Sequence, residues 1–432
     1  MAKTSGDEAG TWLPTRQFRL VKLSSMAGST VESYDFAVFG SIAALAFSKV
    51  FFPSLGPVAG SVASLAIFSS AFLARMVGGV FFGQFGDRLG RRRVLIATLI
   101  LMGIGTLGVA FLPGAAAIGI MAPVLLLLLR LVQGFSLGGE YAGSILLVVE
   151  NTAPSKRPAV VAWPLLGGTL GFVVASLVLL VVSLAMSEEA FLAWGWRISL
   201  LFGAVLILIG LFIRSRIEET KDFARFVRGE QPFRSPLRAV TRSHFAEIGM
   251  GVAMFTTPFA FNYIAASYLI AYARQQLHLE PTTVLIADTC SGVVYVLSVL
   301  LGVWVSMRVG VTRALLVFGA AEAVIALTLF PLVDLAPPFT YALGVALALS
   351  CSAFAAVPAW IIMIHAFPVG LRYTGSALTY NTAAVAGGAV TPLIAVWLHT
   401  AVGSEAIGLY LLLLVCLGTG LGWRLAGRAT TA

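Results

Sequence analysis

Long apolar runs separated by short polar loops make up most of this chain. A helix needs about 20 mostly apolar residues to cross the hydrocarbon core of a membrane, and twelve runs reach that length. They lie at 25–48, 60–86, 94–112, 118–148, 160–185, 196–214, 246–272, 284–306, 314–332, 338–365, 374–398 and 405–425. This pattern predicts an all-α membrane protein with twelve transmembrane helices.

The loop 83–93, with the sequence GQFGDRLGRRR, indicates how these helices are oriented. It places one acidic and four basic residues directly between two apolar runs: Asp87, Arg88, Arg91, Arg92 and Arg93. Such a cluster cannot lie in hydrocarbon, so the loop must lie at a membrane surface. Its net positive charge favours the cytoplasmic surface.

The remaining loops agree with this orientation. The loops on the same side carry Lys3, Arg16, Arg19, Lys22, Lys156, Arg157, the eight basic residues of 214–242, Arg308, Arg313, Arg372, Arg424 and Arg428. The loops on the opposite side carry only Lys49, Arg197 and Arg274. We therefore predict a multi-pass protein of the bacterial inner membrane with both termini in the cytoplasm.

One long polar stretch, 215–245, divides the twelve runs into six and six. We predict a cytoplasmic tail at 1–24, a six-helix bundle at 25–214, a linker at 215–245, a second bundle at 246–426 and a tail at 427–432. Within the linker, 216–228 is expected to form an amphipathic helix that turns Ile217, Phe223, Phe226 and Val227 toward lipid.

The two halves show weak internal similarity. Arg88-Leu89-Gly90 is followed by Pro154, and Arg308-Val309-Gly310 is followed by Pro368, each in corresponding loops. A duplicated six-helix unit explains this correspondence and is typical of secondary transporters. Met307 stands at the position that matches Asp87, so the second copy has lost its acidic residue.

Composition excludes several other classes of protein. The chain is 59% hydrophobic and 11% charged, whereas soluble domains carry about 25% charged residues. Its net charge of +9 is spread over the loops, so we do not expect nucleic acid as a partner. The three cysteines lie far apart, with no metal or disulfide spacing. No nucleotide-binding loop and no nucleophile constellation is present, so neither an enzyme nor ATP-driven transport is expected.

Charged residues inside the apolar runs are the first candidates for function, because a charge within the bilayer costs several kcal/mol. The first run contains Glu32 and Asp35, which share one helix face, with Tyr34 between them. We hypothesise that both acids couple protons and that Tyr34 binds substrate. The alternative is that both acids are solvated near the inner surface.

The fourth run contains Arg130, Gln133, Glu140 and Tyr141. Arginine keeps its proton and needs a carboxylate or an anionic ligand, and Asp35 is the natural partner. We expect proton coupling to involve Arg130 and Glu140, and substrate binding to involve Arg130, Gln133 and Tyr141. The alternative is an ion pair that only directs helix packing. Small residues at 134, 138, 139 and 143 predict that another helix packs closely here.

Other polar residues are weaker candidates. Arg75 either faces the substrate cavity or extends to the inner surface. Further candidates for the cavity lining are Asn262, Tyr263, Trp360, Tyr380 and Asn381, although Trp360 could equally face lipid. Glu247, Asp288 and Glu322 are either proton sites or interfacial residues, and His365 is interpreted as a hydrogen-bonded interfacial residue.

The loop GQFGDRLGRRR resembles the loop 2–3 signature of the major facilitator superfamily. Three further stretches narrow the resemblance: VESYDFAVFG at 31–40, RLVQGFSLGGEYAGS at 130–144 and FPVGLRYTGSALTYNTAAVAGGAVTP at 367–392. Together they are similar to the metabolite:H⁺ symporter family, whose members carry shikimate, 2-oxoglutarate, citrate, proline or betaines. WGWRISLLFG and RIEET, around 194–220, also fit, so the resemblance covers nearly the whole chain.

The resemblance implies a rocker-switch carrier with two pseudo-symmetric six-helix bundles and a central site containing Asp35 and Arg130. It also implies a conformational latch in which Asp87 braces Arg372 and Arg91 pairs with Glu150. Gly83, Arg88 and Gly90 complete the latch motif. The chain departs from the family at Ser33, where members commonly have Trp. The latch is expected to be one-sided because the second half lacks the Asp.

These observations predict a secondary active transporter that couples protons to the symport of a small polar metabolite. Arg130 and Arg75 favour a carboxylate, although a zwitterion or betaine fits as well. We expect a monomer in the lipid bilayer with no cofactor, driven by the proton gradient. A uniporter or proton antiporter of the same fold remains open. A non-transporting sensor is less favoured, because it would need an added signalling domain.

Overall fold

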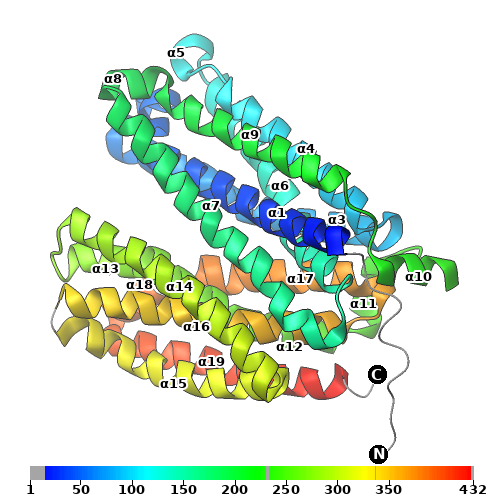
Figure 1. Cartoon of the computed structure of the whole chain (residues 1–432). Coiled ribbons are helices and arrows are strands. Elements are labelled where there is room, and N and C mark those ends of the chain that lie inside the picture. The colour runs from blue at the N-terminus through cyan, green and yellow to red at the C-terminus, as the bar shows by residue number, and fades with distance from the viewer. Residues whose placement is uncertain (1–14, 230–232, 336, 430–432) are drawn as a thin grey trace, which may run out of the picture. The chain divides into compact units, whose positions relative to one another are not determined.

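The computed structural model describes residues 15–229, 233–335 and 337–429, and this part of the chain is helical without any β-strand (Figure 1). Twelve helical segments in the described residues are long and apolar enough to cross a membrane. The predicted fold class and the predicted number of spans are therefore confirmed. The first fourteen residues of the predicted tail lie outside the described part.

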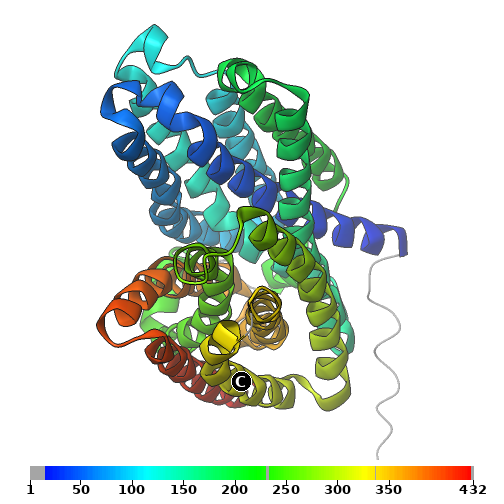
Figure 2. The same ribbon diagram turned by 90° about the vertical axis from the view of Figure 1, so that its left-hand side faces the viewer.

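The helices group into two compact units. Unit 1 takes in 1–153 and 163–234, and unit 2 takes in 154–162 and 235–432. The unit boundary near 234 falls inside the predicted linker. Helix α7 is shared, because its first six residues belong to unit 2 and the rest to unit 1. Figure 2 shows each unit as a bundle of long helices.

Unit 1 is built from α1 (Thr15–Ile42), α3 (Gly56–Leu89), α4 (Arg91–Ala110), α6 (Met121–Val149), most of α7 (Arg157–Ala185), α9 (Trp196–Ser215) and α10 (Lys221–Gly229). Three short helices lie between them, α2 (Ser48–Phe51), α5 (Ala115–Ile118) and α8 (Glu188–Ala190). Short π-helical segments, Ala43–Phe47 and Phe191–Gly195, extend two of the spans.

Unit 2 is built from α11 (Pro236–Ser243), α12 (Phe245–Tyr263), α13 (Leu269–Gln275), α14 (Pro281–Val309), α15 (Val311–Leu335), α16 (Phe339–Ala366), α17 (Arg372–Ala383), α18 (Thr391–Ala401) and α19 (Ser404–Ala429). The π-helical segments Ile264–Tyr268 and Ala384–Val390 join α12 to α13 and α17 to α18. Segments of this kind are frequent at functional sites.

One predicted boundary and one predicted environment differ from the structure. Helix α1 begins at Thr15, ten residues before the expected start, because Val21, Ser24 and Ser25 on its extension are buried. In the linker, Ile217 and Phe223 are also buried, so the prediction that they face lipid was wrong. Of the other two residues of the predicted apolar face, Phe226 is half-buried and Val227 is exposed.

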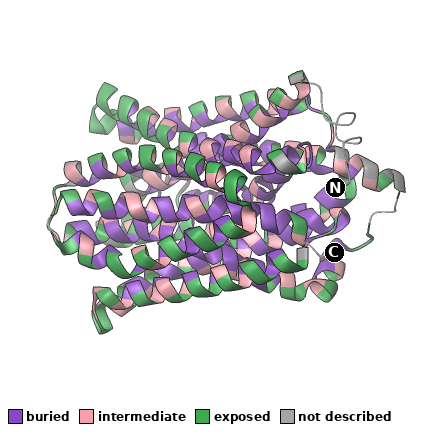
Figure 3. Ribbon diagram, turned by 60° about the horizontal axis from the view of Figure 1, so that its bottom comes forward, coloured by how far each residue is buried: buried purple, intermediate pink, exposed green. Residues whose placement is uncertain are grey.

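Many residues along the helices are exposed (Figure 3), and large apolar side chains are numerous among them. Leu73, Leu184 and Leu393 are among the most exposed of the large hydrophobic residues. A soluble protein rarely exposes apolar patches on this scale, so this surface matches a lipid environment. In contrast, Asp35, Arg91 and Arg130 are buried inside unit 1.

Glycine allows helices α3 and α6 to approach closely in unit 1. A Cβ added at Gly138 would lie 2.6 Å from the carbonyl carbon of Gly78, and closer still to the backbone of Arg75 and Gly79. Gly134 meets the backbone of Ala71 in the same way. The close helix packing predicted from the small residues of the fourth run is therefore confirmed.

We expect Gly138→Ala to destabilise the protein by about 1–3 kcal/mol, because α3 and α6 would have to move apart. Gly292→Ala in α14 is the matched control, since nothing lies within 4 Å of the added Cβ. It should leave stability unchanged or raise it slightly. Thermal unfolding of both variants in the same detergent measures the difference, and equal melting temperatures would contradict the packing role.

Candidate functional site

A buried polar cluster lies inside unit 1, where α1, α4 and α6 meet. The carboxylate of Asp35 accepts a 2.5 Å hydrogen bond from the Thr106 hydroxyl and two 3.1 Å bonds from the Gln133 amide. The Arg130 Nη1 atom lies 3.8 Å from Asp35 Oδ2. Asp35, the carboxylate that was expected to pair with Arg130, therefore lies beside it. Thr106 was missed, because a single Thr in an apolar run gives no distinctive signal.

Aromatic rings surround the rest of the Arg130 guanidinium. Its centre lies 4.0 Å from the Phe39 ring, 5.1 Å from Phe68 and 5.4 Å from Phe36. These faces attract a cation where water is excluded. The Arg130 Nη2 atom has no hydrogen-bond partner among the described residues. This buried N–H group can therefore donate a hydrogen bond to a further anionic group.

Glu32 and Arg75 form a second ion pair, between α1 and α3, with 2.9 Å between Glu32 Oε1 and Arg75 Nη2. The two side chains are only 7% and 13% exposed. Arg75 lies near the middle of its span, which runs from Ala59 to Leu89. It therefore remains inside unit 1, and the alternative of extension to the inner surface is excluded.

Glu140 does not lie in the Asp35 cluster, contrary to expectation. It pairs with Arg214 of α9, and its other described contacts are hydrogen bonds from Thr98 (2.9 Å) and Ser144 (3.1 Å). Glu140 follows Arg130 by ten residues, which is about 15 Å along a helix. Arg130 and Glu140, which were both expected to take part in proton coupling, therefore belong to separate ion pairs. Arg214 was missed because it stands at the end of its apolar run and was counted among the basic residues of the cytoplasmic side.

The two tyrosines proposed to bind substrate lie in different settings. Tyr34 is buried, and its hydroxyl donates a 2.7 Å hydrogen bond to the Ser199 carbonyl of α9. Its ring also packs on Phe202, with 5.7 Å between centroids. Tyr34 therefore holds α1 against α9, and we no longer expect it to contact substrate. Tyr141 is half-buried, next to Glu140 on α6.

The candidates from the second half all belong to unit 2, around α12, α16 and α17. Trp360 is 1% exposed and lies 4.9 Å, between ring centroids, from both Phe255 and Tyr380. The alternative that Trp360 faces lipid is therefore wrong. Buried Asn381 donates to the Ala377 carbonyl at 2.8 Å. The remaining two candidates are both half-buried, Asn262 and Tyr263.

The four titratable candidates of unit 2 have different surroundings. Glu247 pairs with Arg428 at 3.0 Å, and Asp288 accepts a 3.4 Å bond from Tyr341. Glu322 is 2% exposed, and its Oε1 atom has no hydrogen-bond partner among the described residues. His365 contacts the Arg157 guanidinium and the Ile361 carbonyl, each at 2.7 Å, which agrees with the interpretation of a hydrogen-bonded histidine. No group of three or more metal-ligating side chains occurs in the described part of the chain.

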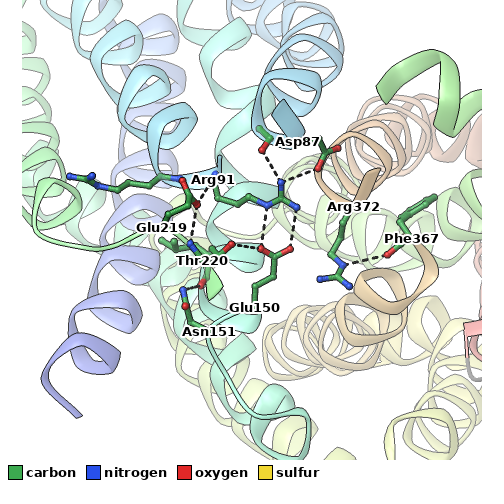
Figure 4. A network of polar contacts seen from close by, with 11 residues as sticks. Asp87, Arg91, Glu150, Asn151, Glu219, Thr220, Phe367 and Arg372 are labelled. Carbon is green, nitrogen blue, oxygen red and sulfur yellow. Dashed lines mark hydrogen bonds and ion pairs between the residues drawn. The ribbon is translucent and has the colours of Figure 1, made fainter. Parts of the chain in front are cut away.

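A fully buried charge network joins the end of α3, the start of α4 and the end of α6 (Figure 4). Arg91 lies 3.0 Å from Asp87 and makes two 3.2 Å hydrogen bonds to the Glu150 carboxylate. The Arg91–Glu150 pairing implied by the family resemblance is thus present. Asp87 and Arg372 belong to different units, so their pairing stays a prediction. Within unit 2, Arg372 donates to the Phe367 carbonyl at 3.4 Å.

The segment after α9 completes this network, which the sequence did not predict. Glu219 accepts hydrogen bonds from the backbone N–H groups of Arg91 (2.9 Å) and Arg92 (3.2 Å), at the first turn of α4. A carboxylate at this position accepts hydrogen bonds from backbone N–H groups that have no partner within the helix. Its negative charge also interacts favourably with the helix dipole. Thr220 donates to Glu150 at 2.7 Å. An acidic pair directly after a buried span was the signal that could have revealed this contact.

Gly90 is required at this point for two reasons. Its φ of +102° suits glycine, and an added Cβ would lie 2.7 Å from the Glu219 carboxyl carbon. Two further residues complete the motif without entering the charge network. Gly83 is buried within α3, and Arg88 donates to the carbonyls of Phe233 and Arg234.

Known proteins with similar sequences are transport proteins. The family described as "Sugar (and other) transporter" matches residues 21–235. The inner membrane metabolite transport protein YhjE of Escherichia coli K12 is 33% identical, over 94% of each chain. The shikimate transporter of the same organism is 32% identical over 95% of each chain. Its proline/betaine transporter is 33% identical over 86% of this chain and 76% of its own.

Solved structures share the fold. The proton:xylose symporter XylE of the major facilitator superfamily superposes with a TM-score of 0.77, at 15% identity and 95% coverage of each chain. The Escherichia coli fucose:proton symporter FucP superposes with a TM-score of 0.69, at 18% identity, over 96% of this chain and 98% of its own. With the sequence relatives, this shows that the chain belongs to the major facilitator superfamily, among its metabolite transport proteins, and is a transporter of small molecules rather than an enzyme.

Proposed function

We propose that this transporter couples the inward movement of protons to the uptake of a small polar metabolite that carries a carboxylate or is a zwitterion. The observation that carries the proposal is the Asp35–Arg130 pair. Both residues are buried well inside their membrane spans, and Arg130 keeps one donor without a partner. Ionisable residues at such depth mark proton or substrate sites in transporters.

The coupling follows from the charges of this pair. While Asp35 is ionised, its carboxylate neutralises Arg130. A proton on Asp35 removes that negative charge and leaves the guanidinium to hold an anionic group of the substrate. Gln133 hydrogen-bonds to Asp35 and also accepts from Arg130 at 3.3 Å, so it can follow either charge state. Rocking of the two halves around the site would then release substrate and proton together.

The substrate class follows from relatives and charge. The related transporters of shikimate and of proline or betaine carry a carboxylate and zwitterions, respectively. Arg130 and Arg75 could bind the carboxylate of either kind of molecule, and their partners Asp35 and Glu32 could bind the cationic group of a zwitterion. A uniporter or proton antiporter is the main alternative. It would show no uptake driven by an inward proton gradient, whereas a sensor would not move substrate at all.

The same proposal includes the setting of the protein. The asymmetry of basic residues between loops supports an orientation with both termini in the cytoplasm. The inner-membrane location of YhjE supports a bacterial inner membrane for this chain. We propose a monomer that uses the proton gradient without a cofactor.

We also propose that the charge network around Arg91 acts as a conformational latch. Asp87, Glu150 and the Glu219–Thr220 segment all converge on one end of unit 1. Loss of one partner from a buried ion pair strongly destabilises a protein, because the other charge is left buried without compensation. A network of this kind therefore favours the single arrangement of helices in which all its contacts are made.

We expect Asp35→Asn to abolish accumulation against a concentration gradient, because a neutral amide cannot cycle a proton. Proteoliposomes with an imposed pH gradient should take up labelled shikimate, proline or glycine betaine only to the equilibrium level. Glu247→Gln, which changes an acid outside the cluster, serves as the control and should accumulate substrate like the wild type. Full uphill transport by Asp35→Asn would show that the coupling role is wrong.

We expect Arg91→Gln to reduce stability by about 3–5 kcal/mol, because it leaves Glu150 buried without its cation. Arg93→Gln removes an exposed charge two residues away and should change stability by less than about 0.5 kcal/mol. Thermal unfolding of the purified variants measures both effects. If the two substitutions cost the same, the Arg91 network is not a stabilising latch.

A further inference from the structure

A stripe of buried polar residues runs along the contact between α1 and α6. We call it the polar seam and define it as Ser25, Gly28, Glu32 and Asp35 of α1 with Gln133, Glu140 and Ser144 of α6. Steps of three or four residues keep the α1 members on one helix face. The seam begins at the Asp35–Arg130 pair and ends toward the loop 83–93, at Ser25 in the N-terminal half of α1 and Ser144 near the C-terminal end of α6.

Hydrogen bonds between α1 and α6 define both ends of the polar seam. At one end Gln133 hydrogen-bonds to Asp35, and at the other the Ser25 hydroxyl donates to the Ser144 carbonyl at 2.6 Å. Between these ends, Gly28 leaves space for the Glu140–Arg214 pair, because an added Cβ would overlap both side chains. The pair therefore lies against α1, although neither partner comes from that helix.

Glu32 occupies the middle of the polar seam. It follows Gly28 by one turn and precedes Asp35 by one turn. It interacts electrostatically with both Glu140 and Arg214. Its Oε1 atom pairs with Arg75, whereas its Oε2 atom is buried and has no hydrogen-bond partner among the described residues. A buried acceptor without a donor in this position is suited to receive a proton.

Each acid of the polar seam has its own arginine: Asp35 with Arg130, Glu32 with Arg75, and Glu140 with Arg214. With all three acids ionised, the six charges sum to zero. One proton gives the buried region a single positive charge, and a second proton would leave two uncompensated guanidinium groups. Because uncompensated buried charge is costly, this balance allows one proton at a time.

We propose that the polar seam is the route by which the transported proton leaves Asp35, through Glu32 and then Glu140, toward the end of unit 1 at loop 83–93. At each step one O–H bond breaks on the donor carboxyl and one forms on the next, directly or through an intervening water. The vacated carboxylate pairs again with its arginine. Arg214 is a positioning residue, because it holds Glu140 against α1 and draws it back to the ionised state once the proton has left.

This proposal rests on the proposed proton-coupled function but makes a separate statement about it. Proton release is needed for net uptake, whereas exchange of substrate across the membrane needs no release, because substrate and proton can return together. A residue of the exit route should therefore affect net uptake and spare exchange. A residue that only holds helices together should affect both in proportion to the loss of folded protein.

The test uses Glu140→Gln in proteoliposomes with labelled shikimate, or with proline or glycine betaine if the wild type accumulates those instead. We expect net proton-driven uptake to fall by about a hundredfold, the lower end of the effect of removing a positioned proton-transfer group. Exchange against preloaded unlabelled substrate should stay close to the wild-type rate. Glu140→Asp, which keeps the carboxyl group, should recover part of the net uptake.

Two further variants separate the route from folding. Thr98→Val removes a hydrogen bond to Glu140 without removing a carboxyl group, and should keep both activities. The double variant Glu140→Gln/Arg214→Gln removes both charges, so it leaves no unpaired guanidinium if the single variant is unstable. It should again lose net uptake and keep exchange.

The outcomes are distinct. Net uptake by Glu140→Gln at the wild-type rate would overturn the route, as would equal losses of net uptake and exchange in a variant with the wild-type melting temperature. If the wild type itself shows no uptake driven by a pH gradient, the proposed function fails instead. Loss of coupling in Asp35→Asn together with normal net uptake in Glu140→Gln would keep the proposed function and refute only the route.

Discussion

The arrangement of unit 1 depends on one constraint, that a charge buried in an apolar interior must have an opposite charge beside it. Three arginines of this unit, Arg91, Arg130 and Arg214, are completely buried beside acids, and Arg75 is nearly so. Each pair joins two helices or a helix and a loop. The low dielectric makes an unpaired member costly, so the pairs determine which helices lie together and at what register.

Close helix contact makes these pairs geometrically accessible. Gly78, Gly134 and Gly138 bring α3 onto α6, and Gly28 makes room on α1 for the Glu140–Arg214 pair. Gly90 admits the Glu219 carboxylate to the start of α4. In lipid, where no hydrophobic force drives helices together, packing of small residues and polar contacts supply the association. The close packing and the candidate proton site of unit 1 therefore share the helices α1, α3 and α6.

The partner of Asp35 could be predicted from the sequence, whereas the partner of Glu140 could not. Asp35 and Arg130 could be matched from sequence, because each is a lone charge deep in an apolar run and needs a partner. Glu140 could not be matched in this way, since Arg214 stands at the boundary of its run, where hydropathy cannot distinguish a buried residue from a solvated one. The same ambiguity explains Ile217 and Phe223, whose apolar character was evident although the surface they cover was not.

The class of fold, the twelve spans, the division into two halves and the family could be predicted from the sequence, because these follow from hydrophobic length, charge distribution and local motifs. Only the tertiary structure reveals that Glu32 pairs with Arg75 and Glu140 with Arg214, that the Tyr34 hydroxyl bonds to α9, and that Glu219 caps α4. These contacts join residues more than a hundred positions apart in several cases. Their partners depend on helix rotation and on distances of a few ångströms, which no periodic pattern along a single chain records.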